Sequence, residues 1–295
     1  MNGIIIIDKP KGITSHDVVS KIRKLYHIKK VGHTGTLDPN ATGVLPILIG
    51  NATKLSKYLT EHDKTYIATI KLGEQTDTLD SEGVIIKKSK VDEKNMQKGR
   101  IKEILQNFLG KQAQQPPIYS AIKVNGKKLY EYARNGIDVE IPKREIEIYK
   151  INLESINKKE REIIIKVQCS KGTYIRTLCK DIAEKLETVG YMKELRRVSV
   201  NNFNIDNAID IVKLEKNKDN QLFLDMQIIS MEKIFTNFPK IELEQKKLDA
   251  LLNGVKLTYL KPDGLYKIYN KNKIFQGFGI IENHLLKRDV MEEQV

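Results

Sequence analysis

The hydrophobic pattern of the chain alternates between short β-like runs and amphipathic helical runs. The first run, Gly3–Ile7, contains four consecutive isoleucines and is typical of a buried strand. Ser15 is a candidate N-cap for a helix whose apolar residues, from Val18 to Leu25, fall on one face. The apolar run Val44–Ile49 again predicts a buried strand, and Lys64–Leu72 alternates as a half-buried strand does.

The same periodicities predict elements over most of the remaining chain. Further strands are expected at Ile118–Val124, Val139–Ile156, Glu162–Cys169 and Leu195–Phe203. Helices are expected at Thr53–Leu59, Asp92–Leu109, Lys127–Arg134, Gly172–Leu186 and Ala208–Leu214. Asn125-Gly126 is a strong hairpin or turn signal. Because regular βαβ alternation and a glycine-rich nucleotide-binding signature are absent from the sequence, the pattern predicts an α+β fold with a mixed, largely antiparallel central sheet flanked by helices.

The composition changes past Phe235. A short helix is expected at Glu244–Asn253, followed by alternating segments at Leu265–Tyr269 and Ile274–Ile281. This stretch is typical of a compact β-rich module that is small for a lone domain. We therefore expect two domains, residues 1–235 and residues 236–295.

The charge balance indicates a polyanionic partner. The 295 residues include 51 Lys and Arg against 38 Asp and Glu, which gives a formal net charge of +13. An excess of this size favours nucleic acid first and an anionic membrane second. The alternative is a generally Lys-rich proteome, in which the excess has no specific partner.

Cysteine usage and the amino terminus indicate a cytoplasmic protein. Cys169 and Cys179 form neither a metal-ligand pattern nor a disulfide framework, so buried reduced thiols are expected. The amino terminus lacks a basic start followed by a signal-length apolar segment. No stretch approaches the length of an apolar membrane span.

Asp38 lies in the most tightly specified stretch of the chain, Gly32–Gly43. Three glycines in twelve residues allow positive φ angles or a close ligand approach, and Pro39 directs Asp38 away from helical geometry. An acid on a loop beside a buried strand is a candidate for chemistry. The alternative is a solvated turn aspartate, because Asp-Pro turns are common.

Four other sites contain residue types suited to chemistry, and each has an ordinary structural explanation. Lys9-Pro10 ends the first strand, Tyr66 lies in an alternating strand, and Arg176 lies at the start of a helix. Leu195-Arg196-Arg197 offers two cations to phosphate. The alternative for Lys9-Pro10 is an ordinary strand-to-helix turn, and the alternative for Tyr66 is a half-buried core aromatic. The alternative for Arg176 is a surface arginine, and for Leu195-Arg196-Arg197 it is a solvated basic segment.

Taken together and in order, these motifs identify a family. The matching segments are Asp8-Lys9-Pro10, Gly32-His33-Thr34-Gly35-Thr36-Leu37-Asp38-Pro39 with Ala41-Thr42-Gly43, Lys64-Thr65-Tyr66, Gln115-Pro116-Pro117 with Tyr119-Ser120-Ala121, Gly172-Thr173-Tyr174-Ile175-Arg176, and Leu195-Arg196-Arg197. From Gly3 to about Phe203 the chain resembles the bacterial tRNA pseudouridine-55 synthases of the TruB family. The resemblance implies the pseudouridine synthase fold and, by analogy, an RNA-binding PUA-like carboxyl-terminal module.

The resemblance also implies a reaction without cofactor or metal. An enzyme of this family cuts the C1′–N1 bond of one uridine in tRNA, turns the base and rejoins it through C5. Asp38 matches the catalytic aspartate, which must be ionised to attack or to accept a proton. Whether Asp38 attacks C1′, attacks C6 or stabilises a glycal route stays open at this stage.

Other residues receive roles from the same resemblance. Arg176 matches the arginine that pairs with the catalytic aspartate, and Tyr66 matches the tyrosine that stacks on the target base and helps to remove the C5 proton. Tyr174 and Leu195 match residues that line the pocket, and Lys9-Pro10 supports it. His33 matches the histidine placed against the position that the flipped base vacates. Candidates for phosphate contacts are Lys29, Lys30, Lys127, Lys128, Arg196 and Arg197.

Two departures from the family pattern concern the rim of the implied site. The family commonly has a histidine where this chain has Tyr191, and a glycine-bearing turn where it has Ser199-Val200-Asn201-Asn202. These departures affect the expected details of RNA contact at the rim, and they leave the expected chemistry unchanged.

The resulting hypothesis is a stand-alone enzyme that isomerises uridine 55 in the T-arm of tRNA and also helps tRNA to fold. Under this hypothesis the enzyme uses no guide RNA, does not bind a membrane and requires no protein partner. One alternative is an RNA-binding folding helper in which catalysis is secondary. Another is an RNA-guided synthase of the dyskerin type, although the chain has no long basic tail.

Overall fold

The computed structural model describes residues 1–60 and 62–292, and the chain divides into two compact units. Unit 1 comprises Met1–Asp38, Leu45–Thr60 and Asn207–Val295, and unit 2 comprises Pro39–Val44 and Glu61–Asp206. One division between the units therefore falls directly after Asp38. The predicted division at residues 235 and 236 stays a prediction.

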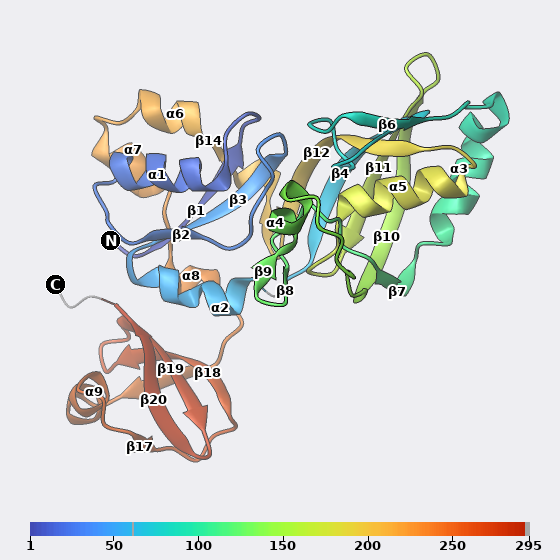
Figure 1. Ribbon diagram of the computed structural model, residues 1–295. Helices are drawn as coiled ribbons and strands as arrows, with labels where there is room; N and C mark the ends of the chain where they lie inside the picture. Colours follow the sequence, from blue (N-terminus) through green and yellow to red (C-terminus); the bar gives the residue numbers. More distant parts are fainter. Residues whose placement is uncertain (61, 293–295) are drawn as a thin grey trace. The chain divides into compact units, whose positions relative to one another are not determined.

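Unit 1 contains a small mixed sheet with helices packed on it (Figure 1). Its strands outside the carboxyl-terminal module are β1 (Gly3–Lys9), β2 (Val31–His33), the part of β3 (Thr42–Ile49) from Leu45 onward, β14 (Ile209–Asp210) and β15 (Ile229–Ser230). Its helical segments there are α1 (Ser15–Leu25), the 3₁₀ turn η1 (Gly50–Leu55), α2 (Ser56–Leu59), α6 (Ile211–Lys216), α7 (Gln221–Met226) and α8 (Met231–Ile234). Strand β1 runs parallel to β14 and antiparallel to β15. The isoleucines of β1 are buried, which confirms the sequence prediction of a core strand.

The carboxyl-terminal module of unit 1 is a five-stranded sheet with one helix. Its elements are β16 (Lys240–Leu243), α9 (Gln245–Leu252), β17 (Leu257–Thr258), β18 (Gly264–Asn270), β19 (Phe275–Glu282) and β20 (Leu285–Met291). The strand order is β16-β18-β19-β20-β17. The module has its own buried cluster, which includes Ile241, Leu251 and Ile268. The prediction of a β-rich carboxyl-terminal module is confirmed.

Unit 2 is built on a long sheet with the strand order β3-β12-β4-β11-β10-β7. Its strands, after the first residues of β3, are β4 (Lys64–Leu72), β5 (Glu74–Thr76), β6 (Ile85–Lys88), β7 (Gly110–Gln114), β8 (Lys123–Val124), β9 (Lys127–Lys128), β10 (Arg144–Asn157), β11 (Glu162–Cys169), β12 (Gly190–Val200) and β13 (Phe203–Asn204). Its helical segments are η2 (Glu93–Met96), α3 (Lys98–Gln106), α4 (Leu129–Arg134) and α5 (Ile175–Lys185), with the short turn η3 (Ile205–Asn207) at its end. Helix α5 packs on β12 and β4, and α3 packs on β10 (Figure 1).

The predicted α+β class with a mixed, largely antiparallel sheet is confirmed. Within unit 2 the β3–β12 pairing is parallel and the β12–β4, β4–β11 and β11–β10 pairings are antiparallel. The bounds of β4 and β11 agree with the sequence prediction. These two strands alternate cleanly in sequence because one face of each is buried.

Several local predictions were wrong, and three of them concern segments near the predicted site residues. The expected strand Ile118–Val124 is a strand only at its last two residues, because the Ser120 N–H donates to the Ile118 carbonyl in a tight turn. The helix expected from Gly172 begins at Ile175, since Gly172 has a φ of 78° that a right-handed helix cannot contain. Thr14, and not Ser15, is the N-cap of α1, because Thr14 Oγ1 accepts from the Asp17 N–H at 3.0 Å while the Ser15 hydroxyl bonds the backbone of Leu37.

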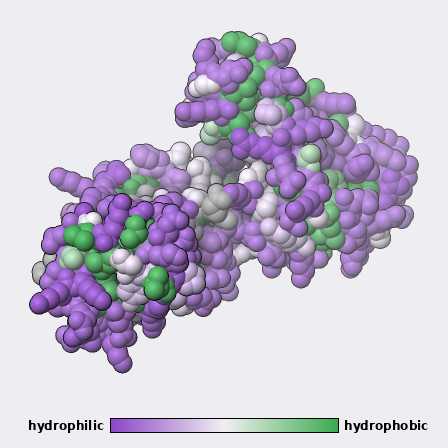
Figure 2. All heavy atoms as spheres, turned by 90° about the horizontal axis from the view of Figure 1, so that it is seen from below, coloured by the Kyte–Doolittle hydropathy of each residue, from purple (hydrophilic) through white to green (hydrophobic). Residues whose placement is uncertain are grey.

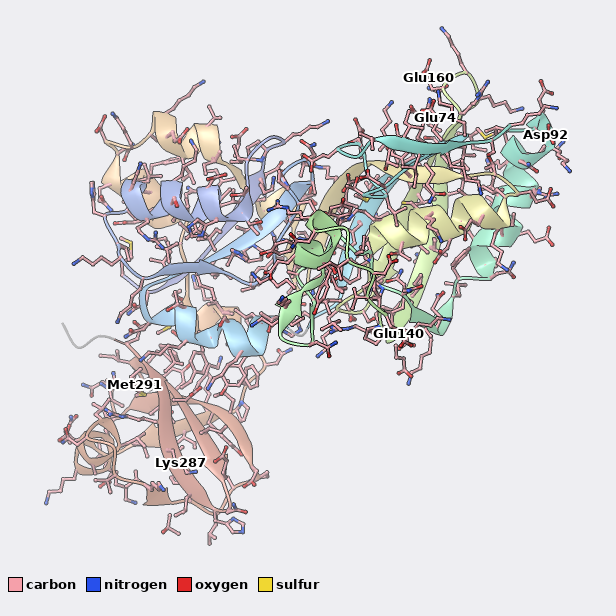
Figure 3. The ribbon with its side chains drawn as sticks, in the orientation of Figure 1. Glu74, Asp92, Glu140, Glu160, Lys287 and Met291 are labelled. Atoms are coloured by element: carbon pink, nitrogen blue, oxygen red, sulfur yellow. The ribbon has the colours of Figure 1, made fainter. Side chains whose placement is uncertain are left out.

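Polar side chains dominate the surface. Figure 2 shows hydrophilic residues over most of one face, with apolar patches between them. Among the labelled side chains of Figure 3, Glu160 lies at the turn between β10 and β11 and is exposed, and Lys287 on β20 pairs with Glu282 at 2.7 Å. Among the described residues, no helix is both long and apolar enough to cross a membrane.

Gly43 allows β3 and β12 to approach closely. It pairs in register with Arg197, has a φ of 103°, and a Cβ there would lie 2.1 Å from the Arg197 carbonyl oxygen. We expect Gly43→Ala to lower the free energy of unfolding by about 1–3 kcal/mol, through clash and backbone strain together. Chemical denaturation measures this loss.

Gly126→Ala is the matched control for Gly43→Ala. Gly126 also has a positive φ, 83°, but a Cβ there meets nothing within 4 Å. The control therefore carries the backbone strain without the clash. Equal destabilisation of the two variants would contradict the packing argument.

Candidate active site

Asp38 follows a residue that is anchored within unit 1. Leu37 is buried, its N–H donates to Ser15 Oγ at 2.9 Å, and Ser15 Oγ donates to the Leu37 carbonyl at 3.1 Å. Upstream in the same loop, the Thr34 N–H donates to the Pro46 carbonyl at 3.3 Å. Asp38 itself is half-buried. The anchored backbone of Leu37 thus fixes the start of the segment that carries the Asp38 carboxylate. The sequence could not show this anchoring contact.

His33 and Lys9 occupy other parts of unit 1. His33 ends β2, is partly exposed, and its Nδ1 accepts from the Gly35 N–H at 3.3 Å. Lys9 is fully buried, and its Nζ donates to the Pro10 carbonyl at 2.9 Å and the Ile13 carbonyl at 2.7 Å. These bonds close the turn between β1 and α1. Lys9 and Pro10 therefore stabilise this turn, and their support of a substrate pocket stays a prediction.

Tyr66 and Arg197 form a buried pair in unit 2. Tyr66 on β4 lies opposite Arg197 on β12 in the antiparallel register, and the two side chains are hydrogen-bonded. Arg197 is 1% exposed and Tyr66 is 8% exposed. The Arg197 Nε also donates to the Val44 carbonyl at 2.8 Å. Burial lowers the pKa of the Arg197 guanidinium, and the charge interaction and hydrogen bond with Tyr66 oppose that effect.

The expectation that Arg197 contacts phosphate is wrong for this structure, because its guanidinium is buried. The neighbouring Arg196 is partly exposed, and its Nη1 donates to Thr42 Oγ1 at 3.3 Å. Lys29, Lys30 and Lys127 are exposed, and Lys128 is partly exposed near the ring of Tyr130. The sequence contained no signal that distinguished Arg197 from Arg196.

Strand β12 is irregular on both sides of Leu195. Its register against β4 shifts between Met192 and Glu194 and again between Arg197 and Ser199. Such bulges bend a strand and redirect its side chains. Leu195 lies between them, half-buried and opposite Ala68. At the end of β12 this chain has Ser199-Val200-Asn201-Asn202 where the family pattern has a glycine-bearing turn. Asn201 takes a φ of 51° there, a backbone conformation that asparagine tolerates.

Tyr174 is the N-cap residue of α5 and is held by Gln114. The Tyr174 N–H donates to Gln114 Oε1 at 2.8 Å, and Gln114 Nε2 donates to the Tyr174 carbonyl at 3.0 Å. Gln114 is buried at the end of β7. This two-way amide contact fixes the start of α5, whose first turn carries Arg176.

Arg176 pairs with Asp80, an acid that the sequence interpretation did not select. Arg176 Nη1 lies 3.2 Å from Asp80 Oδ2 and 3.3 Å from the Thr78 carbonyl, while Nη2 donates to the Tyr119 carbonyl at 3.1 Å. The side chains of Arg176 and Asp80 are 11% and 13% exposed. Asp80 belongs to a strained loop, since Leu79 has a φ of 62°. The guanidinium is therefore fixed in a largely desolvated position within unit 2.

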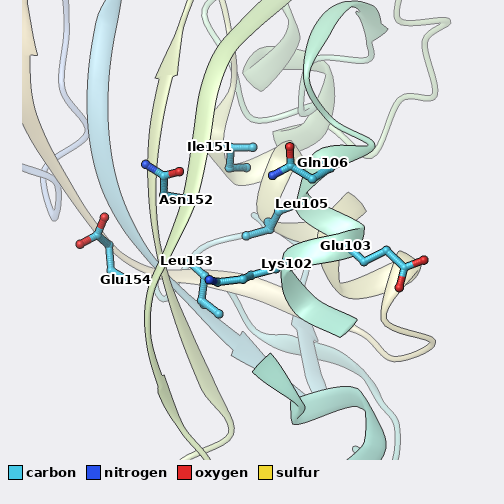
Figure 4. A pocket seen from close by; sticks show the side chains of 8 residues that line it. All are labelled: Lys102, Glu103, Leu105, Gln106, Ile151, Asn152, Leu153 and Glu154. Carbon is cyan, nitrogen blue, oxygen red and sulfur yellow. The ribbon is translucent and has the colours of Figure 1, made fainter. Parts of the chain in front are cut away.

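Unit 2 also contains a surface groove and two cysteines. Figure 4 shows a groove between α3 and β10, lined by Lys102, Glu103, Leu105, Gln106, Ile151, Asn152, Leu153 and Glu154. No site residue predicted from the sequence lines that groove. The thiols of Cys169 and Cys179 are free and buried, as expected, and burial raises the pKa of the Cys169 thiol to about 12. Among residues 1–60 and 62–292, no group of three or more His, Cys, Asp and Glu could hold a metal ion.

Two family models match adjoining parts of the chain. Residues 23–175 match the model of the TruB family pseudouridylate synthase, N-terminal domain. Residues 176–236 match the model of the tRNA pseudouridylate synthase B C-terminal domain.

Curated relatives are similar over nearly the full length. The tRNA pseudouridine synthase B of Caldanaerobacter subterraneus subsp. tengcongensis is 43% identical over 289 residues, which are 97% of this chain and 98% of the relative. The protein of the same name from Clostridium acetobutylicum is 44% identical over 285 residues, which are 95% of each chain.

Solved structures share the fold at lower identity. A chain of a Cbf5-Nop10-Gar1 complex superposes with a TM-score of 0.70 at 24% identity, covering 99% of this chain and 84% of that one. A chain of an H/ACA RNP bound to a substrate RNA containing 2′-deoxyuridine gives a TM-score of 0.70 at 22% identity, covering 99% and 85%.

Proposed function

The chain belongs to the TruB family of pseudouridylate synthases, and we propose that its substrate is uridine 55 in the T-loop of tRNA. As a member of this family it is an isomerase that forms pseudouridine in tRNA. The observation that supports the proposal most strongly is the half-buried Asp38 carboxylate, on a loop anchored by Leu37. A carboxylate in such a position is available to the sugar or the base of a uridine that leaves its stack.

In the proposed reaction Asp38 acts first. The C1′–N1 bond of the uridine breaks with help from the Asp38 carboxylate, at C1′, at C6 or through a glycal. The base turns and C5 forms the new bond to C1′. The C5–H bond then breaks, its electron pair restores the C5=C6 double bond, and N1 gains a proton. Atoms and charge balance, so the reaction needs no co-reactant.

The proposed roles in unit 2 belong to Tyr66, Tyr174, Arg176 and Leu195. Tyr66 stacks on the target base and receives the C5 proton, while Tyr174 and Leu195 line the pocket. Arg176 keeps the catalytic carboxylate ionised, and Asp80 together with two backbone carbonyls holds the guanidinium in place. Tyr66 and Leu195 lie on strands, Tyr174 is the N-cap residue of α5, and Arg176 lies in the first turn of that helix.

RNA binding in this proposal extends over both units. His33 occupies the position that the flipped base leaves, and Lys9-Pro10 supports the pocket from the turn between β1 and α1. The carboxyl-terminal module is a PUA-like RNA-binding module. Lys240 and Lys261 of this module are exposed, so the module presents cations that suit contact with RNA phosphates. Helping tRNA to fold, in the cytoplasm, is part of the proposal.

Binding to tRNA is expected to weaken steeply with salt. The net charge is +13 and several exposed lysines are candidate phosphate contacts. Two to four such contacts would lower affinity about 10- to 100-fold between roughly 0.05 and 0.2 M monovalent salt, since bound counterions are released. Filter binding with labelled tRNA measures the slope. A flat dependence would show that the positive charge is not a binding surface.

The proposed enzyme acts alone, in contrast to an RNA-guided synthase or to a folding helper. A synthetic T-arm hairpin incubated with the purified chain, without other RNA or protein, tests this. We expect pseudouridine at uridine 55. Binding without conversion would favour the folding helper, and conversion only after addition of a second RNA would favour a guided enzyme.

A further inference from the structure

Arg197 is one of the largest fully buried side chains of the protein. A buried guanidinium is costly unless its charge and its donors are satisfied. Two of its partners are known: the Val44 carbonyl, at 2.8 Å from Nε, and the Tyr66 hydroxyl. Both partners belong to unit 2.

The position of Arg197 connects two segments that bear proposed catalytic residues. Its backbone pairs with Gly43, five residues after Asp38, and with Tyr66 on the other neighbouring strand. The bulge that follows, between Arg197 and Ser199, disturbs the regular ladder at this point. Packing alone at this position requires only a large apolar side chain. A charged donor directed at the phenol of Tyr66 is not needed for packing.

A guanidinium beside a phenol oxygen has two chemical effects. It donates a hydrogen bond, which fixes the direction of the remaining lone pairs of that oxygen. It also favours the negatively charged phenolate over the neutral phenol, because opposite charges attract most strongly where water is excluded. An arginine stays protonated and is suited to this task.

We infer that Arg197 is a positioning residue that acts through Tyr66, orienting its oxygen and stabilising its phenolate so that it can take the proton from C5. The inference rests on the proposed function and on the proposed role of Tyr66. In this step the C5–H bond breaks, the proton passes to the Tyr66 oxygen, and the electron pair restores the C5=C6 double bond. The proton later leaves Tyr66 for solvent as N1 gains one.

The test compares single-turnover conversion of tRNA transcripts that carry hydrogen or deuterium at C5 of uridine. Arg197→Met is expected to slow conversion by about 10²-fold, which is a typical contribution of a general base, and to raise the deuterium isotope effect above that of the wild type. Arg197→Lys, which keeps the charge, is expected to recover part of the rate. A slower rate without a larger isotope effect would overturn the inference, because a merely structural role predicts that result.

A double-variant comparison tests whether Arg197 acts through Tyr66. Once Tyr66→Phe has removed the phenol oxygen, Arg197→Met should change the rate by less than about threefold. Multiplicative losses in the double variant would overturn the inference. Arg100→Met is the matched control, since Arg100 is a partly buried arginine of unit 2 whose partner is Glu187 on the surface, and its rate should equal that of the wild type.

Three further outcomes each have a stated consequence. Should Arg197→Met fail to fold, as judged by thermal melting, Arg197→Lys is tested by the same criterion, and an unchanged isotope effect at a reduced rate overturns the inference. Failure of the wild-type chain to convert any uridine would overturn the proposed function and this inference with it. Normal conversion by the wild type, with normal rates in both Arg197 variants, would overturn this inference alone.

Discussion

Replacing Asp38 by asparagine is expected to lower the single-turnover rate by about 10⁴-fold or more. The amide has the shape of the carboxylate but carries no charge, so it can neither attack carbon nor accept a proton. The loop should persist, because its anchors are the backbone of Leu37 and the hydroxyl of Ser15. The affinity for tRNA should therefore change by less than about threefold. The measurements are conversion of tRNA under excess enzyme and filter binding.

Asp219→Asn is the matched control for Asp38→Asn. Asp219 is an exposed acid of unit 1 and lies outside the candidate site. Its removal changes the net charge by the same amount and should leave the rate unchanged. Conversion by Asp38→Asn at a rate near that of the wild type would exclude Asp38 from the chemistry.

Replacing Asp80 by asparagine is expected to lower the single-turnover rate by about 10²-fold. The substitution removes the charge of Asp80, a negative partner of Arg176, while the guanidinium keeps its contacts with the carbonyls of Thr78 and Tyr119. Loss of one partner of a desolvated ion pair costs roughly 2–5 kcal/mol, which is enough to misplace Arg176. Single-turnover conversion measures the loss, and thermal melting shows whether the variant folds.

Asp77→Asn separates this effect from a general disturbance of the loop. Asp77 belongs to the same loop, and its Oδ1 accepts from the N–H groups of Thr78 and Val84, which an asparagine oxygen also accepts. The control removes an equal charge without touching Arg176, and its rate should stay within about threefold of the wild type. Equal losses in the two variants would contradict a specific role for Asp80.

The sequence predicted best the elements that obey local rules. Strand β4, which carries Tyr66, alternates because one face is buried, and its bounds agree with the prediction. The hairpin at Asn125-Gly126 is confirmed, with both residues at positive φ. Helix α5 was placed three residues too early, because the positive φ of Gly172 depends on the turn that it closes.

The parts of the candidate site that the sequence could not predict depend on contacts between distant segments. Asp80 is one of three acids in a polar loop, and only the approach of Arg176 from α5 distinguishes it from Asp77 and Glu82. The burial of Arg197 follows from β12 lying between β3 and β4, which no local pattern encodes. The proposed roles of the predicted site residues stay predictions.

We propose that this chain alone isomerises a single uridine of tRNA. A complete, unmodified tRNA transcript incubated with the purified chain, with every uridine then mapped at nucleotide resolution, tests it most directly. We expect one pseudouridine for each tRNA, at position 55, with the Asp38→Asn variant inactive in the same assay. Conversion at another uridine, or a wild-type chain that leaves uridine 55 intact, would contradict it.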